Sequence, residues 1–380
     1  MTCMSVTDDE NPLVVAQLIG SFSGGGAQRV AYDLVCGMAG PGVRSLGIAI
    51  RGLGDGLEFD IPGTEFCTLS ESGRSFASLA RISFRLRNLF VQERVRVVHV
   101  HGTGSLPLAI LAARLCLNRP RVCFTWHDSG EVLEHGRFRT AVLAWCVRRC
   151  DWITASSRNV AARLASNAGV TKVDVLHGGV ALKPLSVSGS SQPVQIAWIA
   201  SLTANKDPIL LLRAIAKLRD EGFSIAAVFA GGPFAQSASY EREVLDARER
   251  LGLTQIAKFT GQVSRAEVDQ LLAGSLIGVQ TSRSEGLSLA LLEQMMHGLA
   301  VVATDVGDTR DAILHEQTGL LYQPGDEAGL TDHLRRLLLD GAMRGRLGVA
   351  ARARAMSDFS VDSTSEKALA HYQHFSVKQG

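Results

Sequence analysis

Two stretches near the start of the chain, LVVAQLI at residues 13–19 and GGGAQRV at residues 24–30, indicate how the protein folds. The first is an apolar run of strand length. The second is a glycine-rich turn, and it leads into a helical pattern of apolar residues at Val30, Leu34, Val35 and Met38. A strand that is covered on both faces reads as a nearly continuous apolar run. The pair therefore predicts a strand of a parallel sheet followed by a covering helix.

The same alternation recurs along the chain. Further strands are predicted at residues 95–100, 122–125, 152–155, 173–176, 194–199, 226–230, 256–259, 276–280 and 301–304. Helices are predicted at 106–117, 142–147, 207–220, 238–251, 264–273 and 287–297, and Ser264 with Glu267 forms a capping box. Repeated strand–helix alternation predicts an α/β fold with doubly wound parallel sheets.

A composition change divides the alternation into two halves. Residues 184–193 (PLSVSGSSQP) are rich in Ser, Gly and Pro and have no periodicity, which is typical of a linker. With 380 residues, the chain is long enough for two domains. We expect Rossmann-like domains at 1–183 and 194–360 with a cleft between them. We also expect a C-terminal helix, within 361–380, that packs back across the junction.

The charge balance argues against nucleic acid as a partner. The chain carries 39 Lys and Arg against 37 Asp and Glu, a net charge of +2. Residues 1–183 hold 20 basic and 15 acidic side chains (+5), and residues 184–380 hold 19 and 22 (−3). This uneven split predicts that the two halves have different roles.

Seven scattered cysteines without a C-x-x-C pair favour a reducing compartment. Residues 1–12 are acidic and lack the apolar core of a signal peptide, and the longest apolar stretch, 106–117, is too short to span a bilayer. We therefore expect a cytoplasmic protein.

Residues 81–96 carry five arginines beside an apolar face and could lie on anionic lipid at the inner membrane face, but an ordinary surface helix is favoured.

Three loops at predicted strand ends carry groups suited to chemistry. Backbone amides of the Gly24–Gly26 turn can approach a phosphate or sugar at the following helix, although a plain turn is the alternative. His127 and His101 each end a predicted strand, where an imidazole can bind a substrate hydroxyl, although a lone histidine is more often structural.

The third loop, SRSEGLSL at residues 282–289, precedes a predicted helix that carries Glu293. Glu285 can hold sugar hydroxyls, and the amides of Gly286, Leu287 and Ser288 can bind a diphosphate. Glu293 can accept hydrogen bonds from both hydroxyls of a ribose. Two surface glutamates beside an amphipathic helix are the alternative, and spacing alone does not decide between them.

These residues resemble the retaining family 4 glycosyltransferases, which have the GT-B fold. Glu285-x7-Glu293 resembles the family's E-x7-E signature. The other matches, in chain order from about residue 13 to 325, are GGAQRV (25–30), VVHVHG (97–102), TWHD (125–128), FAGGP (229–233), FTGQV (259–263), DVG (305–307) and TGLL (318–321).

The resemblance implies roles for single residues. It implies that Glu285 and His127 act at the reaction centre and that Lys206 holds the donor diphosphate. It further assigns the donor diphosphate and sugar to Gly25, Gly26, Ser201, Gly286, Leu287 and Ser288, the nucleotide to Gly231, Gln262, Val263 and Glu293, and the acceptor to Arg29 and His101. Two positions depart from the family pattern: Ser201 replaces the usual arginine, and residues 178–181 read GGVA where NGVD is usual.

The implied activity is transfer of a hexosyl or N-acetylhexosaminyl unit, with retention, from a nucleotide diphosphate sugar to an acceptor hydroxyl of a glycan or natural product. No cofactor and no metal is implied, since the chain has no Asp-x-Asp motif, and a UDP-sugar is favoured over a GDP-sugar. The alternatives are a nucleotide-sugar epimerase, a phosphorolytic enzyme, and a catalytically silent nucleotide-sugar-binding subunit, which the change to Ser201 favours. The sequence leaves the oligomeric state open.

Overall fold

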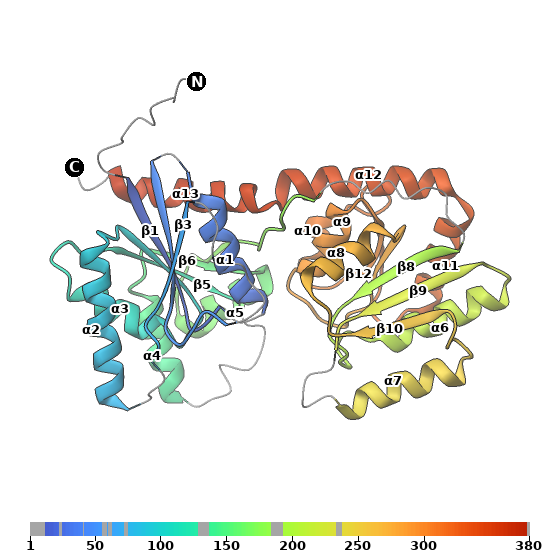
Figure 1. Cartoon of the computed structure of the whole chain (residues 1–380), viewed down its shortest axis with the longest axis horizontal. Helices are drawn as coiled ribbons and strands as arrows, with labels where there is room; N and C mark the ends of the chain where they lie inside the picture. Colours follow the sequence, from blue (N-terminus) through green and yellow to red (C-terminus); the bar gives the residue numbers. More distant parts are fainter. Residues whose placement is uncertain are drawn as a thin grey trace, which may run out of the picture. The chain divides into compact units, whose positions relative to one another are not determined.

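The computed structural model describes residues 12–22, 25–40, 42–54, 59, 63–71, 75–127, 137–183, 193–232 and 238–377. Apart from Pro193, the predicted linker lies outside these residues, as do Gly24 and Asp128. The chain divides into two compact units, one formed by 1–178 with 361–380 and the other by 179–360 (Figure 1).

The first unit is a parallel sheet with the strand order β3-β2-β1-β4-β5-β6-β7. Its strands are β1 (Leu13–Ile19), β2 (Val43–Ala49), β3 (Thr64–Thr68), β4 (Val97–His101), β5 (Arg121–Trp126), β6 (Trp152–Ala155) and β7 (Asp174–Val175). Its helices are α1 (Gly26–Met38), α2 (Phe76–Gln92), α3 (Leu106–Arg114), α4 (Arg137–Val147), α5 (Arg158–Ala168) and α13 (Val361–Val377). The strand order reverses between β1 and β4, and ligands bind such sheets at the carboxyl ends of the strands at this switch point.

The second unit repeats the plan with the strand order β10-β9-β8-β11-β12-β13. Its strands are β8 (Val194–Ile199), β9 (Ile225–Ala230), β10 (Ala257–Gly261), β11 (Ile277–Gln280), β12 (Ala300–Thr304) and β13 (Leu320–Tyr322). Its helices are α6 (Pro208–Asp220), α7 (Ala238–Arg250), α8 (Arg265–Ala273), α9 (Leu289–Met296), α10 (Thr309–Ala312), α11 (Glu327–Leu339) and α12 (Gly341–Asp358). Here the switch point lies between β8 and β11.

The final helix belongs to the first unit. α13 lies against α1, where a Cβ on Gly37 would come within 2.4 Å of Ser365 Oγ. Tyr372 of α13 is fully buried and packs edge-on against His99 of β4 and Trp152 of β6. The last segment of the chain therefore completes the core of the N-terminal sheet.

Several predicted elements need correction at their ends. The predicted capping box of Ser264 and Glu267 is confirmed. The helix predicted at 287–297 begins at Leu289, because Ser288 caps it. The arginine-rich helix predicted at 81–96 is α2, which ends at Gln92, so Arg94 and Arg96 lie beyond it. Among the described residues, no helix combines the length and the apolar character that crossing a bilayer requires.

Candidate active site

Lys206 and Glu285, from two loops of the second unit, form an ion pair between Nζ and Oε1. Lys206 lies between β8 and α6, and Glu285 lies between β11 and α9. Because β8 and β11 are parallel neighbours, their carboxyl ends open onto the same edge. Ser282 donates its hydroxyl to Glu285 Oε1 at 2.7 Å. The fold thus brings together the lysine and the carboxylate that the sequence analysis assigned to the donor.

The backbone around Lys206 is held by the opposite loop. Thr281 donates to the Lys206 carbonyl oxygen at 2.6 Å and accepts from Trp198 Nε1 at 2.9 Å. Asp207 has a φ of 43°, a left-handed value that is strained for a residue with a side chain. Its Oδ2 pairs with Arg283 Nη2 at 2.9 Å. Partners from the β11–α9 loop therefore support this strained position.

The loop of Glu285 rests on a glycine turn. Asp308 N donates to the Gly286 carbonyl oxygen at 2.8 Å. Gly307 has a φ of +53°, and a Cβ there would lie 2.1 Å from the Glu285 carbonyl oxygen. Leu287 and the cap Ser288 follow before α9 begins, so the predicted diphosphate-binding amides lie just ahead of the helix. A side chain on Gly307 would displace the loop that carries Glu285.

Glu293 projects from α9 and is 9% exposed. Its Oε1 pairs with Nη1 of Arg265, the first residue of α8. One carboxylate oxygen is thereby anchored, and Oε2 makes no hydrogen bond or ion pair with the described residues. Arg265 carries no signal in the sequence that marks it as a site residue, since an arginine at a helix start is usually an ordinary surface residue.

The residues assigned to the nucleotide base, together with Ser201, which stands where the family usually has an arginine, lie at the ends of β8, β9 and β10. Gly231 N donates to the Gly261 carbonyl oxygen at 3.0 Å, next to Gln262 and Val263. Gly231 has a φ of +133°, and a Cβ there would lie 1.9 Å from Ala200 O and 3.3 Å from Ser201 N. Only glycine allows this close approach of three loops.

The first unit contains a cavity of ≈ 630 Å³ at the carboxyl ends of β1 and β4. Three predicted residues, Gly26, His101 and His127, line it. Its polar lining also includes residues that the sequence analysis did not identify, namely Ser21, Gln28, Arg51, Glu71, Thr103 and Ser105. Leu79 and Ile82 of α2 with Leu108 of α3 supply an apolar wall. The cavity can therefore hold a molecule with both hydroxyl groups and an apolar face.

The two predicted histidines are in direct contact. His101 Nδ1 and His127 Nε2 lie 2.9 Å apart. Burial lowers the pKa of His127 to about 4 and holds the pKa of His101 well below its usual value. Both imidazoles are therefore neutral at pH 7 and serve as hydrogen-bonding groups.

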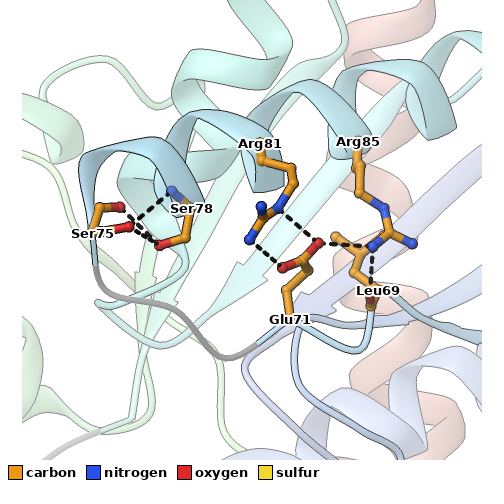
Figure 2. Close-up of polar contacts among 6 residues, drawn as sticks. All are labelled: Leu69, Glu71, Ser75, Ser78, Arg81 and Arg85. Atoms are coloured by element: carbon orange, nitrogen blue, oxygen red, sulfur yellow. Dashed lines mark hydrogen bonds and ion pairs between the residues drawn. The ribbon is translucent and has the colours of Figure 1, made fainter.

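Two arginines of α2 are bound to Glu71 at the cavity wall (Figure 2). Arg85 Nη1 lies 2.9 Å from Glu71 Oε1 and donates to Leu69 O at 2.8 Å, and Arg81 Nε lies 3.2 Å from the same carboxylate oxygen. The hydrogen bond from Arg85 lowers the pKa of Glu71 the most, and the hydrogen bond from Arg81 lowers it further. Ser75 caps the helix by accepting from Ser78 N at 3.2 Å. These arginines thus fix the strand-end loop that carries Glu71.

Two predicted residues lie at α1 and do not line the cavity. Gly25 is the N-cap of α1. Arg29 Nε donates to Asp33 Oδ2 at 2.8 Å, and its guanidinium lies 5.4 Å from the centre of the Tyr32 ring. Arg29 therefore takes part in the packing of α1 in this structure.

Comparisons with known proteins cover both units. Residues 24–183 match the family model described as Glycosyltransferase Family 4, and residues 193–340 match that described as Glycosyl transferases group 1. The glycogen synthase of Mycobacterium tuberculosis is 25% identical over 224 residues, 58% of this chain and 53% of that protein. The D-inositol 3-phosphate glycosyltransferase of Mycobacterium bovis is 28% identical over 215 residues, 53% of this chain and 44% of that protein. The chain thus spans about half the length of the curated relatives it matches.

Solved structures share the fold over nearly the whole chain. A glycosyltransferase from Rickettsia africae has a TM-score of 0.80 at 17% identity and covers 96% of this chain and 99% of its own. HepE from Anabaena, in complex with UDP and glucose, has a TM-score of 0.76 at 18% identity, with 94% and 99% covered. The predicted pair of Rossmann-like parallel-sheet domains of the GT-B type is thereby confirmed. With a family model matching each unit in chain order, the chain belongs to the family 4 glycosyltransferases.

Proposed function

We propose that this glycosyltransferase moves a hexosyl or N-acetylhexosaminyl unit from a nucleotide diphosphate sugar to an acceptor hydroxyl, with retention of the anomeric configuration. The observation that carries the proposal is the pairing of Lys206 with Glu285 at the switch point of the second unit. A cation placed there can neutralise a leaving diphosphate, and the carboxylate beside it can hold the sugar or the developing positive charge.

Fixed protein groups supply the electrostatic stabilisation in this proposal, without a metal ion. Lys206 and the amides of Gly286, Leu287 and Ser288 receive the diphosphate. This arrangement compensates for Ser201, which has no charge where the family usually has an arginine. Glu293, anchored by Arg265, takes the ribose hydroxyls with its second oxygen. Gly231, Gln262 and Val263 hold the base.

A UDP-sugar is the favoured donor. The support comes from a structural neighbour, HepE, which has been solved with UDP and with UDP-glucose. The acceptor is a hydroxyl-bearing glycan or natural product that enters the cavity of the first unit, where His127 faces its hydroxyl groups and His101 supports His127. The cavity's apolar wall suits an acceptor that carries a hydrocarbon or ring face beside those groups.

The state of the cysteines supports a reducing compartment. The described cysteines, Cys36, Cys67, Cys116, Cys123, Cys146 and Cys150, are all free. Burial raises the pKa of Cys146 to about 11, which keeps its thiol protonated and unreactive at neutral pH. We propose a cytoplasmic location on this basis.

Ligand binding and turnover together test the proposal. Thermal unfolding is measured with a panel of UDP- and GDP-sugars for the wild type, Lys206→Ala and the matched control Lys217→Ala on exposed helix surface. A sugar nucleotide at 100 times its Kd adds about 2.7 kcal/mol to stability, and we expect this gain in the wild type and the control but not in Lys206→Ala. Stabilisation of Lys206→Ala equal to that of the wild type would contradict the assigned site.

Product analysis separates the alternatives. An epimerase converts its nucleotide sugar without acceptor, a phosphorolytic enzyme needs inorganic phosphate, and a silent subunit binds without turnover. The pairing of Lys206 with Glu285 supports an active transferase over the silent subunit, because a binding-only protein has no need of a carboxylate at the reaction centre.

A further inference from the structure

Beneath the cavity of the first unit, buried side chains form one continuous series of hydrogen bonds from the Phe124 carbonyl to His127. Thr154 Oγ1 donates its single hydrogen to Phe124 O at 3.3 Å. Thr154 must therefore accept from Thr125 Oγ1, with which it is also hydrogen-bonded. Thr125 in turn accepts from His99 Nε2 at 2.6 Å. A carbonyl oxygen cannot donate, so this end sets the direction of the whole series.

The direction passes through His99 to the C-terminal helix. His99 is fully buried, and burial lowers its pKa to about 3, so its ring is neutral. With the proton on Nε2, its Nδ1 is an acceptor, and the hydroxyl of Tyr372 donates to it. Tyr372 has then used its only hydrogen, so its oxygen can only accept further bonds.

The series ends at the cavity. The Gln17 side chain is hydrogen-bonded to Tyr372, which places Nε2 on that side, and Oε1 accepts from His101 Nε2 at 2.8 Å. His101 is neutral, so its Nδ1 accepts from His127 Nε2 at 2.9 Å. His127 is also neutral and lines the cavity. Its Nδ1 makes no hydrogen bond within the described part of the chain.

We propose that this series fixes His127 as the tautomer with its proton on Nε2, so that Nδ1 is presented to the cavity as a hydrogen-bond acceptor. Gln17 and Tyr372 are then positioning residues, because they act on the substrate only through His101 and His127. This inference rests on the proposed function, in which the cavity binds the acceptor. It adds that the group bound at this point must be a donor, namely a hydroxyl, and that a methylated hydroxyl or a ketone is rejected there.

The reverse direction would cost hydrogen bonds. If His127 carried its proton on Nδ1, then Nε2 would have to accept from His101 Nδ1. His101 Nε2 would then lose its hydrogen and face Gln17 Oε1, placing two acceptors 2.8 Å apart. Turning the Gln17 amide relieves this clash only if Tyr372, His99, Thr125 and Thr154 reverse their directions as well, and Thr154 then gives up its hydrogen bond to Phe124 O at 3.3 Å. The loss of a hydrogen bond in this buried position disfavours the reversed series, which favours a single tautomer.

Nuclear magnetic resonance of protein labelled with ¹⁵N in its histidine rings tests the assignment directly. The His127 signals are identified by their loss in His127→Ala. In the wild type we expect a protonated Nε2 and a bare Nδ1 at pH 7. A protonated Nδ1 on wild-type His127 would overturn the proposal without the need for any variant.

Two variants test the positioning role. Tyr372→Phe removes one buried oxygen on α13, and Gln17→Met removes the acceptor of His101 with little change in volume. We expect both to give a mixture of His127 tautomers and a fivefold to tenfold lower kcat/KM for the acceptor, with an unchanged KM for the nucleotide sugar. Tyr32→Phe and Ser45→Ala are the matched controls, because each removes a buried hydroxyl of the same unit outside the series, and both should keep the wild-type spectrum and kinetics.

An unchanged His127 spectrum in both Tyr372→Phe and Gln17→Met would overturn the positioning role. The proposed function can fail separately. Wild-type protein that shows the expected spectrum but transfers no sugar would contradict the transferase proposal, while the spectrum would still establish the tautomer.

Discussion

Lys206 Nζ pairs with Glu285 Oε1 although 79 residues separate the two in the sequence. The pair joins the loops that follow β8 and β11, and Ser282 supports it by donating to the same carboxylate oxygen at 2.7 Å. Each partner fixes the position of the other before any substrate binds. The pair is therefore a preorganised element of the proposed donor site.

Replacing either member of this pair should reduce turnover strongly. We expect Glu285→Gln and Lys206→Ala each to lower kcat by about 100-fold or more, since the proposed function places both groups against charge that develops in the transition state. Because they act as one unit, the double variant should be less impaired than the product of the single effects. Steady-state kinetics of all three variants measure this coupling.

Glu221→Gln provides the control for the loss of a paired carboxylate, because Glu221 pairs with Arg335 on the surface of the same unit at 2.7 Å. It should keep wild-type kinetics. Near-wild-type turnover in Glu285→Gln would show that the Glu285 carboxylate does not act at the reaction centre.

Arg265 should act on nucleotide affinity through Glu293. In Arg265→Ala, the Glu293 carboxylate loses its anchor, so we expect the KM for the nucleotide sugar to rise about tenfold with little change in kcat, as for loss of a uniform binding contact. Arg335→Ala, which breaks a surface Arg–Glu pair, should leave KM unchanged. An equal KM in Arg265→Ala and the wild type would show that Glu293 does not need this anchor.

Gly307→Ala should damage both stability and activity. A Cβ at Gly307 would lie 2.1 Å from the Glu285 carbonyl oxygen, so the loop must move as well as accept a strained φ of +53°. Gly325 has a similar φ of +78° but open space around it, so Gly325→Ala tests the strain alone. We expect about 1 kcal/mol of destabilisation in Gly325→Ala with normal turnover, and a larger loss with at least tenfold lower kcat in Gly307→Ala.

Urea unfolding and steady-state assays on both glycine variants measure these effects. If Gly307→Ala loses no more stability than Gly325→Ala and keeps its turnover, then the turn does not determine the position of Glu285.

The sequence alone predicted the alternation of strands and helices because buried parallel strands are apolar runs. It missed β2 and β3, since VRSLGIA at Val43–Ala49 mixes polar and small residues and Thr64–Thr68 is only partly buried. Glu285 and Glu293 were candidates from their loop and helix positions, and the family resemblance favoured them over surface glutamates, whereas Lys206 came from the resemblance alone. Their partners were harder to find, because a pairing over 79 residues depends on the strand order of the folded sheet.

Gln17 shows why the first unit's polar network escaped prediction. A single glutamine inside LVVAQLI gives no sequence signal that distinguishes a polar link from an ordinary strand residue. Its role becomes visible only when β1, β4 and α13 place Gln17, His101 and Tyr372 together.

The free energy of unfolding should decrease as the pH is lowered below about 6.5. Burial lowers the folded-state pKa of His99 to about 3 and of His127 to about 4, and it holds that of His101 well below its usual value. In the unfolded chain these histidines take up protons near pH 6.5. Between pH 6.5 and 4 the unfolded state therefore binds more protons, and the free energy of unfolding decreases by up to about 1.4 kcal/mol per pH unit for each histidine.

Urea titrations at pH 7.5, 6.0, 5.5 and 5.0 measure this slope. His99→Phe should reduce this slope by the equivalent of about one proton. A free energy of unfolding that stays constant from pH 7.5 to 5.0 would contradict the neutral, buried state of these rings.

Sugar transfer with retention can be followed at the anomeric carbon of the donor. Purified protein is incubated with a UDP-hexose labelled with ¹³C at C1, with and without a panel of hydroxyl acceptors, and the reaction is followed by ¹³C nuclear magnetic resonance. With an acceptor, we expect the C1 signal to move to a new glycoside of the same anomeric configuration while an equal amount of UDP is released. We expect Glu285→Gln to abolish this change. A product of inverted configuration, or sugar conversion that proceeds equally without acceptor, would contradict transfer with retention.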